Sequence, residues 1–372
     1  MVRNFRGLLC ALLGVSLAIS GLSGCGSKGP SGSSGDLMVG FVFVGPKDDY
    51  GYNQAHAIGA DAVKKIPGVK VVEEERVAED ASITKTMKSM INTDGVKMLY
   101  PTSYGYFKPY VLDAAKEFPE TTFLHCGGRW EEGMPTNVYT YFGNIYECEY
   151  LSGIVAGKTT KSKKLGFIAA KPIPQVRQNI NAFELGAKSA NPDVTCTVIF
   201  TGDWSMPVKE AEAANSLLDQ GVDVLTCHVD SPKVIAETAE KHGIYFCGYH
   251  CSQAKLCPKG YLTGAEWNWE KVYTDEVDEV KAGKKIEPRN LRGGLKAGIV
   301  KMSPYGAPVD DATKKDADAV KAKFMDGGFV IFKGPLKDNT GKEVIPAGTG
   351  YPSGDPELDK MDYFVDGVKA EK

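Results

Sequence analysis

Short apolar runs alternate with amphipathic stretches from residue 37 onward. Apolar runs bounded by turn residues are typical of buried strands, whereas apolar positions with helical periodicity predict helices. On this basis we expect strands at 38–44, 69–74, 96–100 and 122–125, and helices at 53–65, 82–92 and 107–116. A regular alternation of strand and helix is the pattern of a parallel sheet covered by helices. The first part of the chain therefore predicts one doubly wound lobe.

A second series of the same kind follows a crossing segment at 137–142. We expect its strands at 165–169, 195–200, 222–227 and 244–247, and its helices at 146–158, 176–189, 209–220 and 232–241. The strand-like run 261–266, the helix-like run 269–282 and the tail from Arg292 must return to the lobes, which makes more than one hinge strand. The predicted fold class is α/β, with two doubly wound parallel-sheet lobes joined by a multi-crossing hinge.

The length of the chain agrees with two lobes, because 372 residues exceed what one hydrophobic core usually spans. We assign residues 37–140 and 262–290 to lobe 1, and residues 141–261 and 291–372 to lobe 2 and the hinge-crossing tail. The net charge is −3, and basic and acidic residues are interspersed along the chain. No basic stripe suggests a nucleic-acid partner.

The first residues predict a signal peptide at 1–25. Arg3 and Arg6 supply positive charge, the apolar stretch 8–19 follows, and small residues precede Cys25. This order is similar to a bacterial lipobox, in which Cys25 is acylated and becomes the mature N-terminus. Residues 26–36 are rich in Gly and Ser and predict a flexible tether. We therefore expect a lipid-anchored, extracytoplasmic protein at the cell membrane; the alternative is an ordinary cleaved signal with an incidental cysteine.

The cysteines leave two alternatives open in one part of the chain. Seven of the nine lie beyond residue 25, so at least one is unpaired or bonded to another molecule. Cys247, Cys251 and Cys257 surround His250, but their spacing fits no usual zinc motif, and no metal or other cofactor is expected. A disulfide between Cys251 and Cys257 is the stronger alternative. Inert buried thiols are expected at Cys126, Cys196 and Cys227.

Several strand ends carry aromatic side chains beside carboxylates or amides. Ligands of open α/β sheets bind beyond the carboxyl ends of the strands, so these residues are the candidate ligand contacts. They are Tyr52, Asn53, Tyr104, Trp204, Asp230, Glu266 and Trp267. Aromatic faces stack on flat ligands, while Asn and Asp side chains read donor and acceptor edges, which suits a heterocycle. The alternative is that turns favour these polar residues in any protein and that the rings only pack.

With these turns assembled, the chain resembles the basic membrane protein family of substrate-binding lipoproteins, which serve ABC importers and include purine nucleoside receptors. The resemblance covers nearly the whole mature chain and rests on the order and spacing of several short motifs. These are Gly51-Tyr52-Asn53-Gln54, Glu149-Tyr150-Leu151-Ser152-Gly153, Gly166-Phe167, Asp219-Gln220-Gly221-Val222-Asp223-Val224 and Gly294-Leu295.

The resemblance implies a clamp of the periplasmic binding protein type I kind, with three crossings between its lobes. In purine-binding members the base lies between two aromatic rings, whose counterparts here are Tyr52 and Trp204. Asn53 would lie beside the base, and Asp230 would face it from the other lobe. Glu266 stands where nucleoside-binding relatives often present a lysine to the ribose, which favours a free base such as adenine over a nucleoside.

The same resemblance implies binding without chemistry. The ligand would stabilise a hinge-closed state, and that state would dock on ABC permease subunits, with the membrane reached through the lipid anchor. The expected partners are thus a purine base or nucleoside, the permease and the membrane.

Other functions remain as alternatives. An exported nucleoside-processing enzyme finds little support, because the chain contains neither G-x-S-x-G nor H-E-x-x-H and its five histidines are scattered. His228 beside Asp230 could form an acid/base pair, but a polar strand end is the simpler interpretation. The stretch 153–159 resembles a phosphate loop but has the wrong glycine spacing and predicts a small-residue helix face. A sugar-binding or sensing protein of the same fold is also possible, with Arg177 and Asn181 as candidate hydroxyl contacts.

Overall fold

The computed structural model describes residues 35–371. Residues from Asp36 onward form one compact unit, which contains both predicted lobes. The predicted signal peptide, Cys25 and nearly all of the predicted tether lie outside the described residues. Within 35–371, no helix is both long and apolar enough to cross a membrane.

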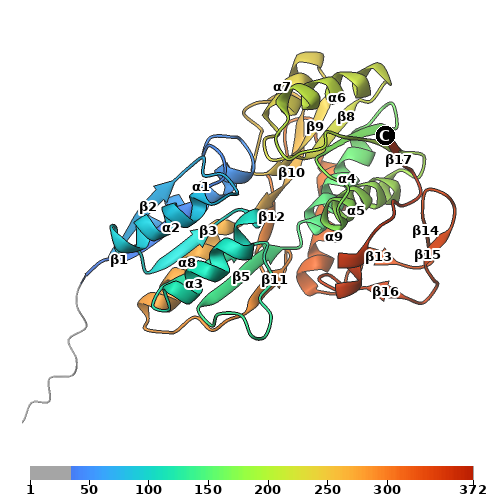
Figure 1. Cartoon of the computed structure of the whole chain (residues 1–372). Coiled ribbons are helices and arrows are strands. Elements are labelled where there is room, and N and C mark those ends of the chain that lie inside the picture. Colours follow the sequence, from blue (N-terminus) through green and yellow to red (C-terminus); the bar gives the residue numbers. More distant parts are fainter. Residues whose placement is uncertain (1–34, 372) are drawn as a thin grey trace, which may run out of the picture. The chain divides into compact units, whose positions relative to one another are not determined.

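The first sheet has six strands in the order β11-β5-β4-β3-β1-β2, and we call it and its helices lobe 1 (Figure 1). Its strands are β1 (Leu37–Val42), β2 (Val69–Glu74), β3 (Met98–Pro101), β4 (Thr122–Cys126), β5 (Val138–Gly143) and β11 (Asn290–Gly293). Its helices are α1 (Tyr52–Val63), α2 (Ser82–Asn92), α3 (Leu112–Glu117) and α8 (Trp269–Lys281), with short turns of helix at Tyr104–Tyr106 and Phe107–Val111. All strand pairs are parallel, as the alternating pattern predicts.

The second sheet has seven strands in the order β12-β10-β9-β8-β6-β7-β17, and we call it and its helices lobe 2. Its strands are β6 (Lys164–Ala169), β7 (Thr195–Phe200), β8 (Val224–His228), β9 (Tyr245–His250), β10 (Tyr261–Trp267), β12 (Val300–Met302) and β17 (Val368–Glu371). Its helices are α4 (Tyr146–Thr159), α5 (Pro174–Ala190), α6 (Pro207–Asp219), α7 (Lys233–His242) and α9 (Asp311–Asp326). Only the β10–β12 pair is antiparallel.

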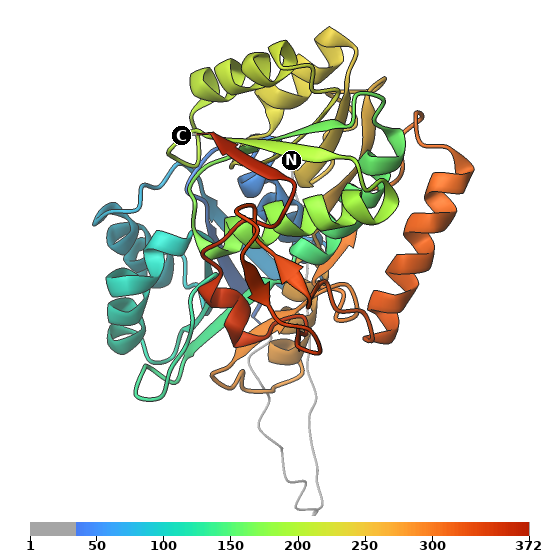
Figure 2. The ribbon, with the colours of Figure 1, turned by 90° about the vertical axis from the view of Figure 1, so that its right-hand side faces the viewer.

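The last part of the chain, residues 333–371, packs on lobe 2, and we call it the C-terminal segment. It contains the short strands β14 (Leu336–Lys337), β15 (Glu343–Ile345) and β16 (Gly350–Tyr351), a 3₁₀ turn at Pro356–Lys360, and β17. Strand β13 (Phe332–Lys333) lies at the start of the segment. Figure 2 shows this segment, in red, beside α5. Gln178 Nε2 donates to the carbonyl oxygen of Leu358 at 2.7 Å, and the amide of Asn181 bonds Tyr363 and Val365.

The chain passes between the two sheets three times, after β5, after β10 and after β11. The expected assignment of residues 262–290 to lobe 1 is wrong for β10, which pairs with β9 in the second sheet, while the following helix α8 packs in lobe 1 against α1. The expected boundaries at 140 and 290 also cut β5 and β11, both of which lie in the first sheet. The chain leaves lobe 2 after Trp267, the last residue of β10. Strand β10 follows β9 in the chain and extends the same sheet, so the crossing to lobe 1 comes only with α8.

Helices α4 and α5 approach each other closely in lobe 2. A Cβ added to Gly153 would lie 2.0 Å from the carbonyl oxygen of Phe183, and one added to Gly186 would lie 2.0 Å from that of Tyr150. The stretch that resembles a phosphate loop is thus the packing face of a helix, as the small-residue interpretation predicts.

All seven cysteines of the described residues are buried free thiols. The expectation of inert thiols at Cys126, Cys196 and Cys227 is confirmed. The alternative of a disulfide between Cys251 and Cys257 is not met, because both thiols are free. They flank a turn in which the Cys257 N–H bonds the carbonyl oxygen of Gln253.

Candidate ligand-binding site between the lobes

The loop between β1 and α1 is organised by one carboxylate. Asp49 Oδ1 accepts hydrogen bonds from the N–H groups of Gly51 and Gln54 at 2.8 and 2.9 Å, and Oδ2 accepts from the Asn53 N–H at 2.9 Å. Asn53 Nδ2 also donates to Oδ2, and its Oδ1 accepts from the Gly45 N–H at 3.0 Å. Asn53, a predicted ligand contact, is only 2% exposed and holds this loop together.

The same loop contacts lobe 2 through three hydrogen bonds, which we call the cross-lobe bonds. The Tyr52 N–H donates to the carbonyl oxygen of Asp230 at 2.8 Å. Ser231 Oγ donates to the carbonyl oxygen of Asp49 at 2.6 Å, and Gln253 Nε2 donates to that of Tyr50 at 2.7 Å. Two predicted site residues, Tyr52 and Asp230, are therefore joined directly across the lobes.

Backbone geometry is unusual on both sides of this junction. Tyr50 has φ 59° and His250 has φ 70°, which is the left-handed region that side chains other than glycine seldom adopt. The backbones of the two lobes approach closely at Gly51, because a Cβ there would be 1.9 Å from the carbonyl oxygen of Asp230. Such conformations cluster at functional sites.

His250 links the predicted aromatic residues of the junction. Trp267 Nε1 donates to its Nδ1 at 2.7 Å, so the proton of the neutral ring lies on Nε2, which donates to the Val229 carbonyl oxygen at 3.1 Å. The Tyr52 ring lies edge-on to His250, with centroids 5.4 Å apart. Burial, aided by nearby His228 and His56, holds the His250 pKa well below its usual value and keeps the ring neutral.

His228 is the second histidine of the junction, and its ring lies beside that of Trp204. The two ring centroids are 5.8 Å apart, and the Lys171 ammonium lies 5.6 Å from the centre of the Trp204 ring. The nitrogens of His228 bond Asn179 and Tyr249 at 2.9 and 3.2 Å, which does not fit the acid/base pair considered with Asp230. Burial lowers the pKa of His228 to about 3.

His56, His228 and His250 lie around this junction, and His125 is close enough to His56 to affect its pKa, although the four are scattered in the sequence. Burial lowers the pKa values of His56 and His125 to about 3, and each of these rings also lies close enough to another histidine or cation to feel its charge. The sequence pattern alone did not indicate these histidines as a group. A signal was available, because His125, His228 and His250 stand at or next to the ends of strands β4, β8 and β9.

The two predicted carboxylates differ in their surroundings. Burial, then the field of Asp49, raises the pKa of Asp230 well above its usual value and favours the neutral acid. Glu266 accepts a hydrogen bond from Ser303 Oγ and lies 3.9 Å from Lys301 Nζ, opposite it on β12. Burial raises the pKa of Glu266 as well. A lysine thus lies next to Glu266, on the neighbouring strand.

The remaining candidates differ in their surroundings. Tyr104 is 74% exposed on its 3₁₀ turn, two residues after Thr102, whose carbonyl oxygen accepts a hydrogen bond from Tyr52 Oη at 2.6 Å. Arg177 and Asn181, the candidate sugar contacts, face the C-terminal segment. The Arg177 guanidinium lies 5.5 Å from the Phe364 ring centre, and Asn181 bonds the Val365 N–H at 2.9 Å.

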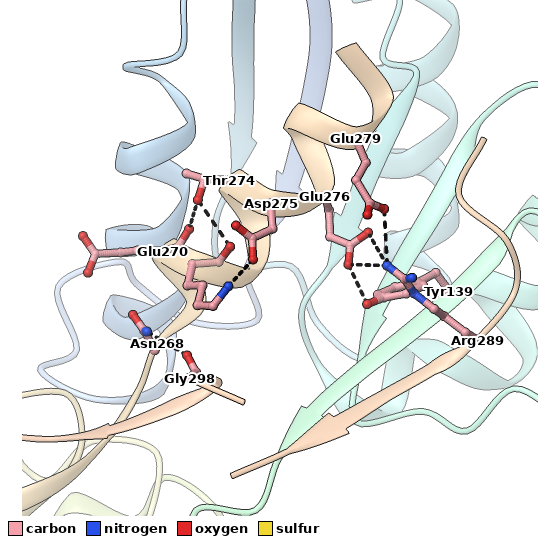
Figure 3. Close-up of polar contacts among 10 residues, drawn as sticks. Tyr139, Asn268, Glu270, Thr274, Asp275, Glu276, Glu279, Arg289 and Gly298 are labelled. Atoms are coloured by element: carbon pink, nitrogen blue, oxygen red, sulfur yellow. Dashed lines mark hydrogen bonds and ion pairs between the residues drawn. The ribbon is translucent and has the colours of Figure 1, made fainter. Parts of the chain in front are cut away.

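A hollow of about 330 Å³ lies elsewhere, between α8 and β11 in lobe 1 (Figure 3). Most of its charged side chains are already paired: Arg289 bonds Glu276 at 3.1 Å, and Lys271 pairs with Asp275. Glu276 also accepts a hydrogen bond from Tyr139 at 2.6 Å. None of the predicted site residues lines it. Within 35–371, no group of three or more His, Cys, Asp or Glu side chains is arranged to hold a metal ion.

Comparisons with known proteins identify the type of protein. Residues 37–332 match the family described as Bmp: ABC transporter substrate-binding protein PnrA-like. The chain is 35% identical over 354 residues to a purine-binding protein of Brucella abortus, which covers 95% of this chain and 98% of that protein. It is 27% identical over 347 residues to a Haloferax volcanii protein whose name proposes glucose binding for an ABC transporter, covering 93% of this chain and 84% of that protein.

The fold has solved counterparts. An ABC transporter solute-binding protein of Conexibacter woesei matches with a TM-score of 0.67 and 22% identity, over 79% of this chain and 97% of that chain. The predicted α/β fold of the periplasmic binding protein type I kind is thereby confirmed, as is the resemblance drawn from the sequence motifs. Proteins of this class bind a small molecule outside the cytoplasm for permease partners. The chain belongs to the Bmp family of ABC transporter substrate-binding proteins.

Proposed function

We propose that the protein binds a purine base, with adenine favoured, or a purine nucleoside between its two lobes. The observation that carries the proposal is the pair of aromatic side chains contributed by opposite lobes. Tyr52 contacts His250 and Trp204 contacts His228, and the two histidine rings are 6.1 Å apart. The purine-binding protein of Brucella abortus, similar over nearly its full length, supports the ligand class.

The electrostatics of the junction favour an uncharged heterocycle. His228 and His250 are held neutral, and burial favours the neutral acid form of Asp230. The ring nitrogens of both histidines are already bonded within the protein, so the rings offer uncharged faces. The neutral carboxylic acid of Asp230 offers a donor beside an acceptor, and a purine edge alternates donors and acceptors in the same way. A charged ligand would meet no buried countercharge in these side chains.

Binding would couple to closure of the lobes. The three cross-lobe bonds belong to a closed arrangement and break when the lobes separate. A ligand that touches both lobes binds the closed state better and raises its population. The permease would then receive the closed, loaded protein.

We also propose that acylated Cys25 anchors the protein to the membrane on its extracytoplasmic side. The supporting features are the small residues before Cys25 and the Gly/Ser-rich stretch after it. Incorporation of a labelled fatty acid into the full chain, and its loss in Cys25→Ala, would establish the anchor; labelling that persists in the variant would refute it.

The ligand is tested by calorimetric titration with adenine, guanine, adenosine and inosine, after unfolding and refolding to remove carried-over ligand. Micromolar or tighter binding of a free base, with nucleosides weaker, is expected. Trp204→Ala should weaken that binding roughly 100-fold, because it removes both buried area and stacking. If no purine binds, the ligand assignment is wrong.

Glucose or another sugar is the second candidate, and the Haloferax volcanii relative is the observation that favours it. The same calorimetry with glucose separates the two. Arg177 and Asn181 add nothing to this alternative, because both side chains pack against the C-terminal segment.

A further inference from the structure

Two buried ring nitrogens near the junction lack a hydrogen-bond partner among the described residues. They are His56 Nε2 and Trp269 Nε1, on side chains that are 0% and 1% exposed. The two rings are stacked, with centroids 5.4 Å apart and planes 4° apart. A buried N–H without a partner is unfavourable, and such groups in native proteins call for an explanation.

Both rings contact side chains that are candidate ligand contacts. His56 stands one turn after Tyr52 in α1, and its ring is edge-on to the Tyr52 ring at 4.7 Å. Trp269 begins α8 and stacks on Trp267 at 4.9 Å. His56 also lies close enough to His250 of lobe 2 to lower its pKa. The two nitrogens are therefore next to the predicted contacts Tyr52 and Trp267.

The hydrogen bonds that His56 Nε2 and Trp269 Nε1 can form follow from their ring chemistry. His56 Nδ1 is hydrogen-bonded to Tyr273 Oη at 2.5 Å, and Tyr273 Oη bonds Tyr141 Oη at 2.7 Å, so one side of the neutral imidazole is occupied. Its Nε2 can give or accept one hydrogen bond, depending on the tautomer. The indole N–H of Trp269 can only donate.

We propose that Trp269 Nε1 donates to a ring-nitrogen acceptor of the ligand, and that His56 Nε2 bonds a second polar atom on the same ligand. This inference rests on the proposed function and deepens it, because it makes both residues determinants of purine specificity. It selects a flat heterocycle with an in-plane acceptor over an aromatic hydrocarbon of the same shape.

The test is titration of the refolded protein and of Trp269→Phe with adenine, 1-deazaadenine, 3-deazaadenine and 7-deazaadenine. Each deaza analogue replaces one ring-nitrogen acceptor by C–H. The wild type should prefer adenine over one analogue by about tenfold, the usual scale of one hydrogen bond, and Trp269→Phe should lose that preference. Trp267→Phe is the matched control, because its N–H is bonded to His250; it should keep the preference even where affinity falls.

A second readout follows His56 directly. In ¹⁵N-labelled protein, adenine should move the Nε2 resonance of His56 more than its Nδ1 resonance. An unmoved Nε2 resonance, or a Trp269→Phe preference equal to the wild type's, would overturn this inference while purine binding stands. If the wild type binds none of the purines, the proposed function fails and this inference fails with it.

Discussion

At the scale of single residues, Tyr52, Trp204, Asp230 and Trp267 meet at the junction between the lobes. All four follow or end strands, where ligands of open α/β sheets bind. The amide of Asn53, which was expected to read a ligand edge, is used within the β1–α1 loop. The position of His250 at the end of β9 was a signal, but its contact with Trp267 could not be predicted, because it joins two neighbouring strands whose register only the fold sets.

Asn53→Ala should destabilise the protein by about 1–3 kcal/mol, since the Gly45 N–H loses its buried acceptor and Asp49 loses a donor. Urea unfolding followed by circular dichroism measures the change. Asn215→Ala on the exposed face of α6 is the control and should change stability little. Equal effects of the two substitutions would contradict the role given to Asn53.

Glu184 should make stability depend on pH. Burial raises its pKa to about 8, above the usual value of 4.5, and both carboxylate oxygens are buried without a hydrogen-bond partner in the described residues. Because the folded state holds a proton that the unfolded state releases, this contribution is intact below pH 4.5 and is lost as pH rises toward 8. The slope is about 1.4 kcal/mol per pH unit at most.

Glu184→Gln removes this titration. Denaturant unfolding of both proteins between pH 5 and 8 should show stability falling with pH in the wild type and a flatter profile in the variant. Parallel profiles would mean that Glu184 is ionised in the folded protein.

At the scale of elements, periodicity located the central strands and helices to within a few residues. The helix at 82–92 begins and ends as predicted, and 146–158 differs from α4 by one residue. The strands β11 to β17 could not be predicted, because each has two to four residues and is held by its partner strand, not by its own pattern. The error at β10 has the same origin, since lobe membership depends on pairing.

Gly153→Ala should destabilise lobe 2 by about 1–3 kcal/mol or more, because the added methyl group would overlap the Phe183 carbonyl in the α4–α5 contact. Thermal unfolding checks this. Gly328→Ala is the matched control, since it has open space around it and should leave the melting temperature nearly unchanged. A shift of similar size in both variants would argue against the close helix contact.

At the scale of the whole described unit, the lobes are joined by more than the three chain crossings. The cross-lobe bonds join the β1–α1 loop to lobe 2, and Arg129 of lobe 1 pairs with Asp359 of the C-terminal segment at 2.6 Å. The exposed ion pair contributes little by itself. The buried Gln253 amide is the stronger connection, because it also bonds the backbone of Tyr249.

Gln253→Leu should weaken ligand affinity by roughly tenfold, because the closed state loses a hydrogen bond that the open state does not make. Spin labels on the two lobes measure the effect. Without ligand, the variant should populate longer distances than the wild type, and at saturation the distances should agree. Unchanged distances in the free protein would show that Gln253 does not control closure.

The pairing of β17 with β7 has a consequence for how the protein behaves in concentrated solution. Strand β7 would otherwise be the last of the second sheet, with its backbone amides and carbonyls free to recruit a strand from another molecule. The four residues of β17 pair with this edge of β7 and leave no room there for another strand. A version truncated after Asp366 should therefore associate through β7, visible as oligomers in light scattering, even where its ligand site is intact.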